Sequence, residues 1–446
     1  MEGSFLHLAL PLFLSFATLI IAVLCNRIRH HLSSSKQPSI TKESVLRLLG
    51  IRLGDIPTTV ILDSAVAVDA LVRRADAFSD RPAGGGATTI ISNGRLQIIT
   101  TAPYGPHWVA LRRNLSSEAF HPVRGLARAA PHRARALAAL IADIAARSAG
   151  GGGAVPIREC LYAALFALNA ATCFGDGVAD GERVEAMRAA QQEFFQILPS
   201  FRVFSTFRKV GHLDGLGTWQ EEMYLPLIRA CQERRNTRGT TAAAAASYVD
   251  TLLDVAVPDE GNPRGRRKLN DGEMVGLVSE YLGAATGTVL ALLEWALANL
   301  VLRPDIQSRL RREVEAAGGE PCAYLRAVES LRRHPPVPSV QRHMSRDVVV
   351  GSASVPRGTL VNFSIEEIGR DGKIWTSPEE FIPDRFMPGG EGEGVRLTIG
   401  SKEATKVMMM PFGAGRRIYM PGDGIRHTSH RVLPCKSDID LRVASI

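Results

Sequence analysis

One acid and two arginines in the C-terminal part of the chain have the types and spacing of an ion-pair system, and a third arginine lies in a glycine-rich turn after them. Glu329 and Arg332 are three residues apart, so a helix would place them on one face. Arg385 follows in the proline-rich stretch WTSPEEFIPDRF, and Arg417 lies in the glycine-rich turn PFGAGRRI. A guanidinium bonds a carboxylate through two parallel hydrogen bonds, which suits the joining of a helix to an irregular loop. Taken alone, Glu329 and Arg332 indicate only an ion pair.

The order of these motifs is more specific than any one of them. The chain resembles the cytochrome P-450 family, in which an EXXR helix, a PERF-like segment and an FxxGxR loop follow one another near the C-terminus. Further upstream, FSDRP (78–82), YGPHWVALRR (104–113) and VPRGTLVNF (355–363) are similar to plant microsomal members. The resemblance covers roughly residues 78–421. It implies a cytochrome P-450-like fold, mainly α with a minor β-sheet.

The resemblance assigns a structural role to the ion-pair residues. Glu329, Arg332 and Arg385 match the family's buried network, which shapes the proximal side of the haem. The resemblance also implies haem as the cofactor, held by residues that match the family's haem-contacting positions: Trp108, Arg112, His343, Phe412, Gly415 and Arg417. Without the other motifs, Trp108 would be a core aromatic, Arg112 a solvated helix residue and His343 a surface residue.

The long apolar segment 271–302 contains the stretch that the family uses for oxygen activation. Thr288 matches the threonine beside which dioxygen binds, and its hydroxyl can hold a water or bend the helix. The preceding position, where the family has an acid, is Gly287. We therefore expect any proton relay to use ordered water or another group. The strip of Gly283, Ala284 and Gly287 suits either a planar cofactor or close helix packing.

The residue at the expected iron-ligand position is not a cysteine. The family has its axial cysteine two residues after the arginine matched by Arg417, and this chain has Tyr419 there. A thiolate donates electron density that favours O–O cleavage, whereas a phenolate is a harder oxygen ligand. Met420 also separates Tyr419 from Pro421, so the loop is one residue longer than the family's pattern. We predict no thiolate ligation and weak or absent haem retention.

Two functions from different classes follow. The first is a haem monooxygenase that takes NADPH electrons from a flavin reductase and inserts one oxygen atom into a small lipophilic substrate, with activity impaired by the missing cysteine. The second is a catalytically inactive, membrane-bound pseudoenzyme or the product of an altered gene model. The tail after Gly424 lacks the apolar helix and hairpin typical of the family. A metal site made by His427, His430 and Cys435 is a weak rival.

The remaining elements follow from hydrophobic periodicity. We expect a strand at 58–63, a helix capped by Ser64, and longer helices at 131–147, 219–234 and 271–302. Because apolar side chains appear on every face of its second half, the helix at 271–302 is predicted to run through the core.

The N-terminus predicts a transmembrane helix. Residues 5–25 hold one ionisable side chain, His7, and are long enough to cross a bilayer. The basic residues that follow favour a cytosolic domain, at the endoplasmic reticulum membrane. A cleaved signal peptide is the alternative. We expect four parts: a membrane anchor with its basic flank (1–31), a hinge and linker (32–57), a cytochrome P-450-like haem domain (58–424) and an atypical polar tail (425–446).

Composition limits the partners. The formal net charge is +8, but lysine and arginine are scattered rather than clustered with aromatics, which argues against nucleic acid and favours a membrane or an acidic partner. The six cysteines form no CxxC pair, which indicates a reducing compartment.

Overall fold

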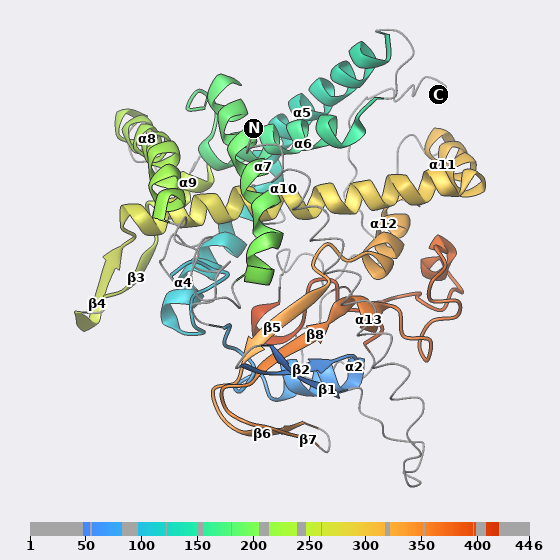
Figure 1. The fold of residues 1–446 in the computed structure, drawn as a ribbon. Helices are drawn as coiled ribbons and strands as arrows, with labels where there is room; N and C mark the ends of the chain where they lie inside the picture. The colour runs from blue at the N-terminus through green and yellow to red at the C-terminus, as the bar shows by residue number, and fades with distance from the viewer. Residues whose placement is uncertain are drawn as a thin grey trace, which may run out of the picture. The chain divides into compact units, whose positions relative to one another are not determined.

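The helix predicted at 271–302 is α10 (Asp271–Leu302) in the computed structural model of the chain, with the bounds expected from the sequence. Its start is fixed by a capping box: the Asn270 side chain accepts a hydrogen bond from the Glu273 amide, and the Glu273 carboxylate accepts one from the Asn270 amide. In Figure 1, α10 is the long yellow helix that crosses the whole width of the helical part. It packs against α6 (Ile157–Phe174), α8 (Asp214–Arg238) and α12 (Cys322–Arg333).

The structure describes residues 48–53, 56–82, 97–121, 123–149, 155–179, 181–204, 214–238, 247–259, 261–316, 322–350, 353–395, 397 and 407–418. All of them belong to one compact unit, Leu46–Ile446. The predicted anchor, most of the hinge, Tyr419 and the polar tail lie outside the described residues.

Helices dominate the described chain, as predicted. Some bounds differ from the expectation: the helix predicted at 131–147 begins earlier and continues through Pro131, and Asp63 rather than Ser64 caps the first short helix, accepting from the amides of Ala65 and Val66. The other helices are α2 (Ser64–Val68), α4 (Pro106–Asn114), α5 (Arg124–Ala149), α7 (Gly181–Phe204), α9 (Tyr248–Leu252), α11 (Pro304–Ala316) and α13 (Ile365–Gly369), with shorter turns η1 (Asp69–Arg73), η2 (Leu115–Ala119), η3 (Pro383–Phe386) and η4 (Gly415–Arg417).

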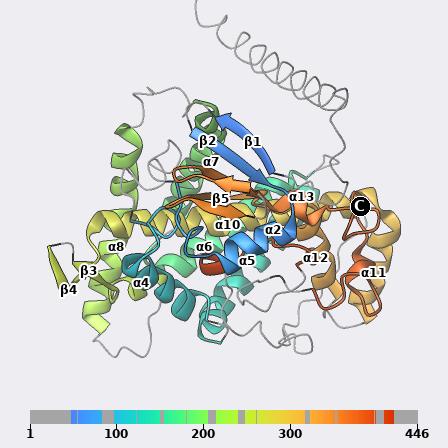
Figure 2. The ribbon, with the colours of Figure 1, turned by 90° about the horizontal axis from the view of Figure 1, so that it is seen from below.

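The minor sheet joins distant parts of the sequence. Its strand order is β1-β2-β8-β5, with β2 parallel to β8 and the other neighbours antiparallel. Figure 2 shows this sheet from below, with α2 beside it. The predicted strand at 58–63 is β2, shifted toward the N-terminus. The strands are β1 (Leu48–Leu53), β2 (Ile56–Ile61), β5 (Ser339–His343) and β8 (Leu360–Ser364), with two hairpins, β3 (Ala256–Asp259) with β4 (Asn262–Lys268) and β6 (Val348–Val350) with β7 (Ala353–Val355).

Burial along α10 differs from the expectation. The first half is the core half, with an almost continuous buried run from Gly272 to Ser279. In the second half, Val301 and Leu302 are 70% and 76% exposed. The prediction that α10 runs through the core therefore holds for its first half, whereas the second half is only partly covered. Within the described chain, α6 and α10 are long and apolar enough to cross a membrane by length and composition alone, a property that core helices share.

Candidate functional site

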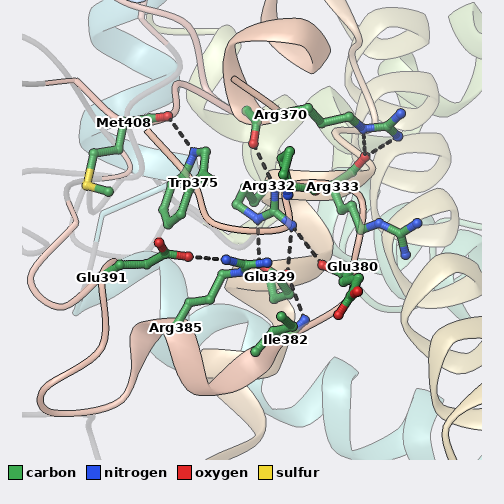
Figure 3. Close-up of polar contacts among 12 residues, drawn as sticks. Glu329, Arg332, Arg333, Arg370, Trp375, Glu380, Ile382, Arg385, Glu391 and Met408 are labelled. Carbon is green, nitrogen blue, oxygen red and sulfur yellow. Dashed lines mark hydrogen bonds and ion pairs between the residues drawn. The ribbon is translucent and has the colours of Figure 1, made fainter. Parts of the chain in front are cut away.

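The predicted pair of Glu329 and Arg332 is a buried, doubly hydrogen-bonded ion pair on α12 (Figure 3). Arg332 donates from Nε to Glu329 Oε2 at 2.6 Å and from Nη2 to Glu329 Oε1 at 2.8 Å. Both side chains have an exposed fraction of 0%. The same Oε1 also accepts from the amide of Ile382 at 2.9 Å. Because every charged atom of the pair has a partner nearby, the cost of removing the charges from water is offset.

Arg385 of η3 lies beside this pair. Its Nε lies 3.5 Å from Glu329 Oε1, an ion-pair distance without hydrogen-bond geometry. Its terminal nitrogens donate to the carbonyls of Thr376 and Ser377 and to the carboxylate of Glu391. Glu391 is a partner that the sequence did not indicate. The acid of α12 thus faces two guanidinium groups, and a second carboxylate helps to balance them.

Arg332 also ties α12 to the loop that follows β8 and α13. Its nitrogens donate to the carbonyls of Gly369, Pro378 and Glu380, and its guanidinium lies 5.3 Å from the ring centre of Trp375. Trp375 in turn donates to the carbonyl of Met408 at 3.2 Å. The network therefore fixes the segment 407–418, which carries the FxxGxR loop.

The FxxGxR loop places Arg417 in a buried position between two distant segments. Arg417 donates to the carbonyls of Ser79 and Ala102, and its guanidinium lies 4.9 Å from the ring centre of Trp108 on α4. Its Nη1 is buried without a hydrogen-bond partner. Burial, with a contribution from Arg81, lowers the pKa of Arg417 to about 10.

Two further arginines approach Arg417 and form what we call the arginine cluster: Arg81, Arg342 and Arg417. Arg342 on β5 is buried, and burial together with the charges of Arg81 and Arg417 lowers its pKa well below the usual value. Burial also lowers the pKa of Arg81, whose Nε has no hydrogen-bond partner. In the described part of the chain, no carboxylate lies within ion-pair distance of these three groups. Glu280 attracts Arg81 and Asp80 attracts Arg417 only from beyond ion-pair distance, so the three cations lack a directly paired carboxylate among the described residues and the cluster fits an anionic ligand.

Haem carries two propionate carboxylates, and the arginine cluster has the charge and the open donors to receive such groups. The residues of the arginine cluster therefore fit the cofactor that the resemblance implies. Two of the cluster's members, Arg81 and Arg342, were not among the predicted residues. Arg81 lies inside the FSDRP motif and Arg342 directly precedes His343, so local sequence gave only weak indications of them.

The other predicted haem-contacting residues take different positions around the cluster. Trp108 is buried on α4 and donates to the carbonyl of Ile99 at 3.0 Å. Arg112, one turn later, donates to the carbonyl of Ile418 at 2.9 Å, so it holds the end of the loop. His343 is half-buried at the end of β5, and its amide donates to the Asp80 carbonyl. Its role at a propionate stays a prediction.

Phe412 and Gly415 shape the loop itself. Phe412 is half-buried against the core group that includes Trp375 and Met408. Gly415 has a φ of +77°, and a Cβ built there would lie 1.8 Å from the carbonyl oxygen of Leu71 in η1. Only glycine allows this approach. The structure therefore explains on steric grounds why residue 415 is glycine, whether or not the residue contacts a cofactor.

On α10, the structure separates two neighbouring threonines. Thr286 is fully buried, and its hydroxyl accepts from the Asn169 side chain of α6 at 3.0 Å. Thr288 is half-buried, and its hydroxyl donates to the carbonyl of Ala284 at 2.8 Å. The sequence allows the Thr288 hydroxyl two possible roles, holding a water or bending the helix, and this bond to the preceding turn corresponds to the second. A Cβ built at Gly287 meets nothing within 4 Å, so the expected acid position opens onto free space.

The comparisons agree with this fold. A profile described as Cytochrome P-450 matches residues 32–418. Cytochrome P-450 89A9 of Arabidopsis thaliana is 34% identical over 398 residues, covering 83% of this chain and 75% of the relative. Cytochrome P-450 78A11 of Oryza sativa subsp. japonica is 31% identical over 410 residues, covering 85% and 70%. A Flavonoid 3'-monooxygenase of Crocosmia x crocosmiiflora is 30% identical over 389 residues, covering 83% and 74%.

Solved structures extend the agreement to the fold. A zebra fish cytochrome P-450 solved with progesterone matches with a TM-score of 0.68 at 21% identity, covering 85% of both chains. The mainly helical body with a minor sheet is therefore the cytochrome P-450 fold. The chain belongs to the cytochrome P-450 family. Family and fold support a haem monooxygenase that receives its electrons from a reductase.

Proposed function

We propose that this chain is a membrane-bound haem monooxygenase whose oxygen activation is impaired because no thiolate binds the iron. The arginine cluster carries the haem part of the proposal: three guanidinium groups meet there without a carboxylate at ion-pair distance in the described chain. The sequence carries the other part, since Tyr419 stands two residues after Arg417 where the family has cysteine. The family match covers Arg417 and ends at residue 418, so the assignment of Tyr419 to the ligand position rests on the sequence motif.

The described residues supply specific functions in this proposal. Bound haem would supply the iron at which dioxygen is activated. Arg81, Arg342 and Arg417 would neutralise its carboxylates, and Trp108 would hold Arg417 in place through its ring face. The Thr288 hydroxyl would hold water on the opposite side, in competition with its bond to Ala284. With Gly287 in place of an acid, proton delivery beside Thr288 would depend on such water.

The deciding experiment is the absorbance spectrum of the full chain, expressed with haem supplied, after reduction and addition of carbon monoxide. We expect haem to be retained only weakly and the Soret band of the bound fraction to lack the red shift typical of thiolate ligation, because a phenol near neutral pH is mostly protonated and a poor ligand. A red-shifted band would overturn the proposed impairment. Exchange of Tyr419 for cysteine should not restore the shift by itself, since Met420 lengthens the loop.

A catalytically inactive pseudoenzyme is the second candidate. The observation that favours it is the combination of Gly287 at the acid position with a Thr288 hydroxyl already bonded to its own helix. Failure to retain haem in the same experiment would select this candidate. Sequencing the transcript across codons 417–424 tests the related possibility of an altered gene model. An in-frame cysteine two codons after Arg417 would return the chain to the active enzymes.

For the cellular setting, we propose the endoplasmic reticulum membrane, with the haem domain in the cytosol. The apolar run at 5–25 and the basic residues after it support this orientation. There the domain would receive NADPH electrons from an acidic flavin reductase and small lipophilic substrates from the membrane. Protease treatment of intact microsomes should remove a C-terminal tag. A protected tag would mean the opposite topology.

A further inference from the structure

A carboxylate of α10 fastens the irregular segment 97–102 to the long helix. Glu280 accepts a hydrogen bond from the amide of Ile99 at 3.1 Å and from the amide of Thr100 at 2.6 Å. The Thr100 hydroxyl donates to the same carboxylate. Two consecutive amides and a hydroxyl therefore converge on one side chain. Charge-assisted bonds of this kind are among the stronger polar contacts in proteins.

The segment 97–102 is also the place where two elements of the haem site attach. The carbonyl of Ile99 accepts from Trp108 of α4, and the carbonyl of Ala102 accepts from Arg417 of η4. The His107 ring bonds the carbonyl of Gln97 at 3.0 Å. Six residues without regular secondary structure are thus hydrogen-bonded to α4, α10 and η4. The segment donates its backbone amides to Glu280 of α10, whereas its backbone carbonyls bond side chains of α4 and η4.

The negative charge of Glu280 strengthens this attachment, because hydrogen bonds to a carboxylate are charge-assisted. Burial raises the pKa of the Glu280 carboxyl, while the three donors at residues 99 and 100 and the charge of Arg81 act in the opposite direction. Arg81 belongs to the arginine cluster, so the Glu280 charge also acts on that cluster. A carboxylate that is costly to desolvate persists there because it accepts these bonds.

We propose that Glu280 is a positioning residue for the haem site: it clamps the segment 97–102 to α10 and so holds the acceptors on which Trp108 and Arg417 depend. The effect of the clamp on haem, through the orientation of the arginine cluster, rests on the proposed function. The clamp itself is a property of the protein before any cofactor is bound.

Hydrogen exchange on the purified full chain, without added haem, tests the clamp. In Glu280→Gln, the amide side chain keeps the size of glutamate but presents one acceptor oxygen and no charge. We expect the amides of Ile99 and Thr100 to exchange about tenfold faster or more, since a bond to a charged group is lost. Thr100→Val, which removes the hydroxyl and keeps both amide bonds, should accelerate exchange less. Unchanged exchange in a peptide covering 97–103 would overturn the proposal.

The matched control is Glu294→Gln, on the same helix. Glu294 pairs with Arg158, whose side chain is 69% exposed, and neither contacts the segment 97–102. We expect its exchange at 97–103 to equal that of the parent. If the control accelerates exchange as much as Glu280→Gln, the effect belongs to α10 as a whole and the clamp is wrong.

Haem titration separates positioning from simple electrostatics. Removing the Glu280 charge beside Arg81 would by itself strengthen binding of an anionic cofactor, whereas loosening the segment weakens it. We expect Glu280→Gln and Thr100→Val both to lower haem affinity, followed by Soret absorbance. Higher or unchanged affinity with faster exchange would overturn the positioning role. If the parent chain itself binds no haem, the proposed function fails, and exchange alone then decides the clamp.

Discussion

Glu329 and Arg332 meet through two parallel hydrogen bonds in a place from which water is completely excluded. The same guanidinium reaches three backbone carbonyls of the segment 369–380. An ion pair of α12 therefore serves as the attachment for a stretch of chain that has little regular secondary structure. Its energetic importance lies in what removal of one partner would leave behind, because an isolated buried guanidinium is far more costly than a pair.

Glu329→Ala should destabilise the protein by about 3–5 kcal/mol, since it leaves Arg332 and Arg385 facing each other without their shared acid. The measurement is the free energy of unfolding from denaturant titration. Glu294→Ala is the control, because its partner Arg158 is exposed and such pairs contribute about 0–1 kcal/mol. Equal losses in the two variants would remove the buried network from the explanation of this fold.

The ion-pair network was predictable because its members lie in ordered local motifs. Glu329 and Arg332 share a helical spacing, and Arg385 lies in a recognisable proline-rich stretch. The capping box at Asn270 is similarly local, and it fixed the start of α10 where the sequence indicated. In contrast, the second half of α10 is apolar but exposed, since hydrophobic periodicity does not say which neighbours are present to cover a face.

Long-range contacts explain why sequence reasoning missed Arg81, Arg342 and Glu280, although Arg417 was predicted from its motif. Arg81, Arg342 and Arg417 come from three segments separated by at least 75 positions, and no spacing rule connects them. Glu280 was missed for the same reason, because its partners Ile99 and Thr100 lie about 180 residues earlier in the chain. A lone acid within an apolar helix indicates a function only when the fold shows which donors face it.

Gly415→Ala should destabilise the loop much more than Gly413→Ala. Both glycines have positive φ, +77° and +74°, so alanine at either position costs about 1–2 kcal/mol from the backbone alone. At Gly413 an added Cβ meets nothing within 4 Å, but at Gly415 it would overlap the carbonyl oxygen of Leu71. Thermal unfolding of both variants gives the comparison. Similar losses would mean that η1 and η4 do not approach as closely as described.

His334 should make stability fall in mildly acid solution. Its ring stacks on Trp295 with centroids 3.9 Å apart, and burial together with the charges of Arg333, Arg370 and Arg332 lowers its pKa to about 4. The unfolded chain binds a proton near pH 6.5, so between roughly pH 6.5 and 4 it holds more protons than the folded protein. Stability from this residue is therefore complete above pH 6.5 and is lost as pH falls through this range.

The test for His334 compares the pH dependence of thermal unfolding in the parent and in His334→Phe, which keeps an aromatic ring but cannot titrate. As pH falls from 7.5 to 5, the unfolding temperature of the parent should fall more than that of His334→Phe, because only the parent loses stability through this residue. Parallel curves for the parent and His334→Phe would contradict the expectation.

Gly287 offers a direct test of the missing acid, because its site on α10 is open. An added Cβ meets nothing within 4 Å, so Gly287→Ala should stabilise the helix by about 0.5–1 kcal/mol. Gly287→Asp should fold equally well and place a carboxylate directly before Thr288, where it can pass protons to a water held by that hydroxyl. In the haem-loaded protein supplied with reductase and NADPH, the aspartate variant should release less hydrogen peroxide per dioxygen consumed than the alanine variant. Equal peroxide release, with both variants folded and haem-loaded, would show that proton delivery at this position is not what limits the chain.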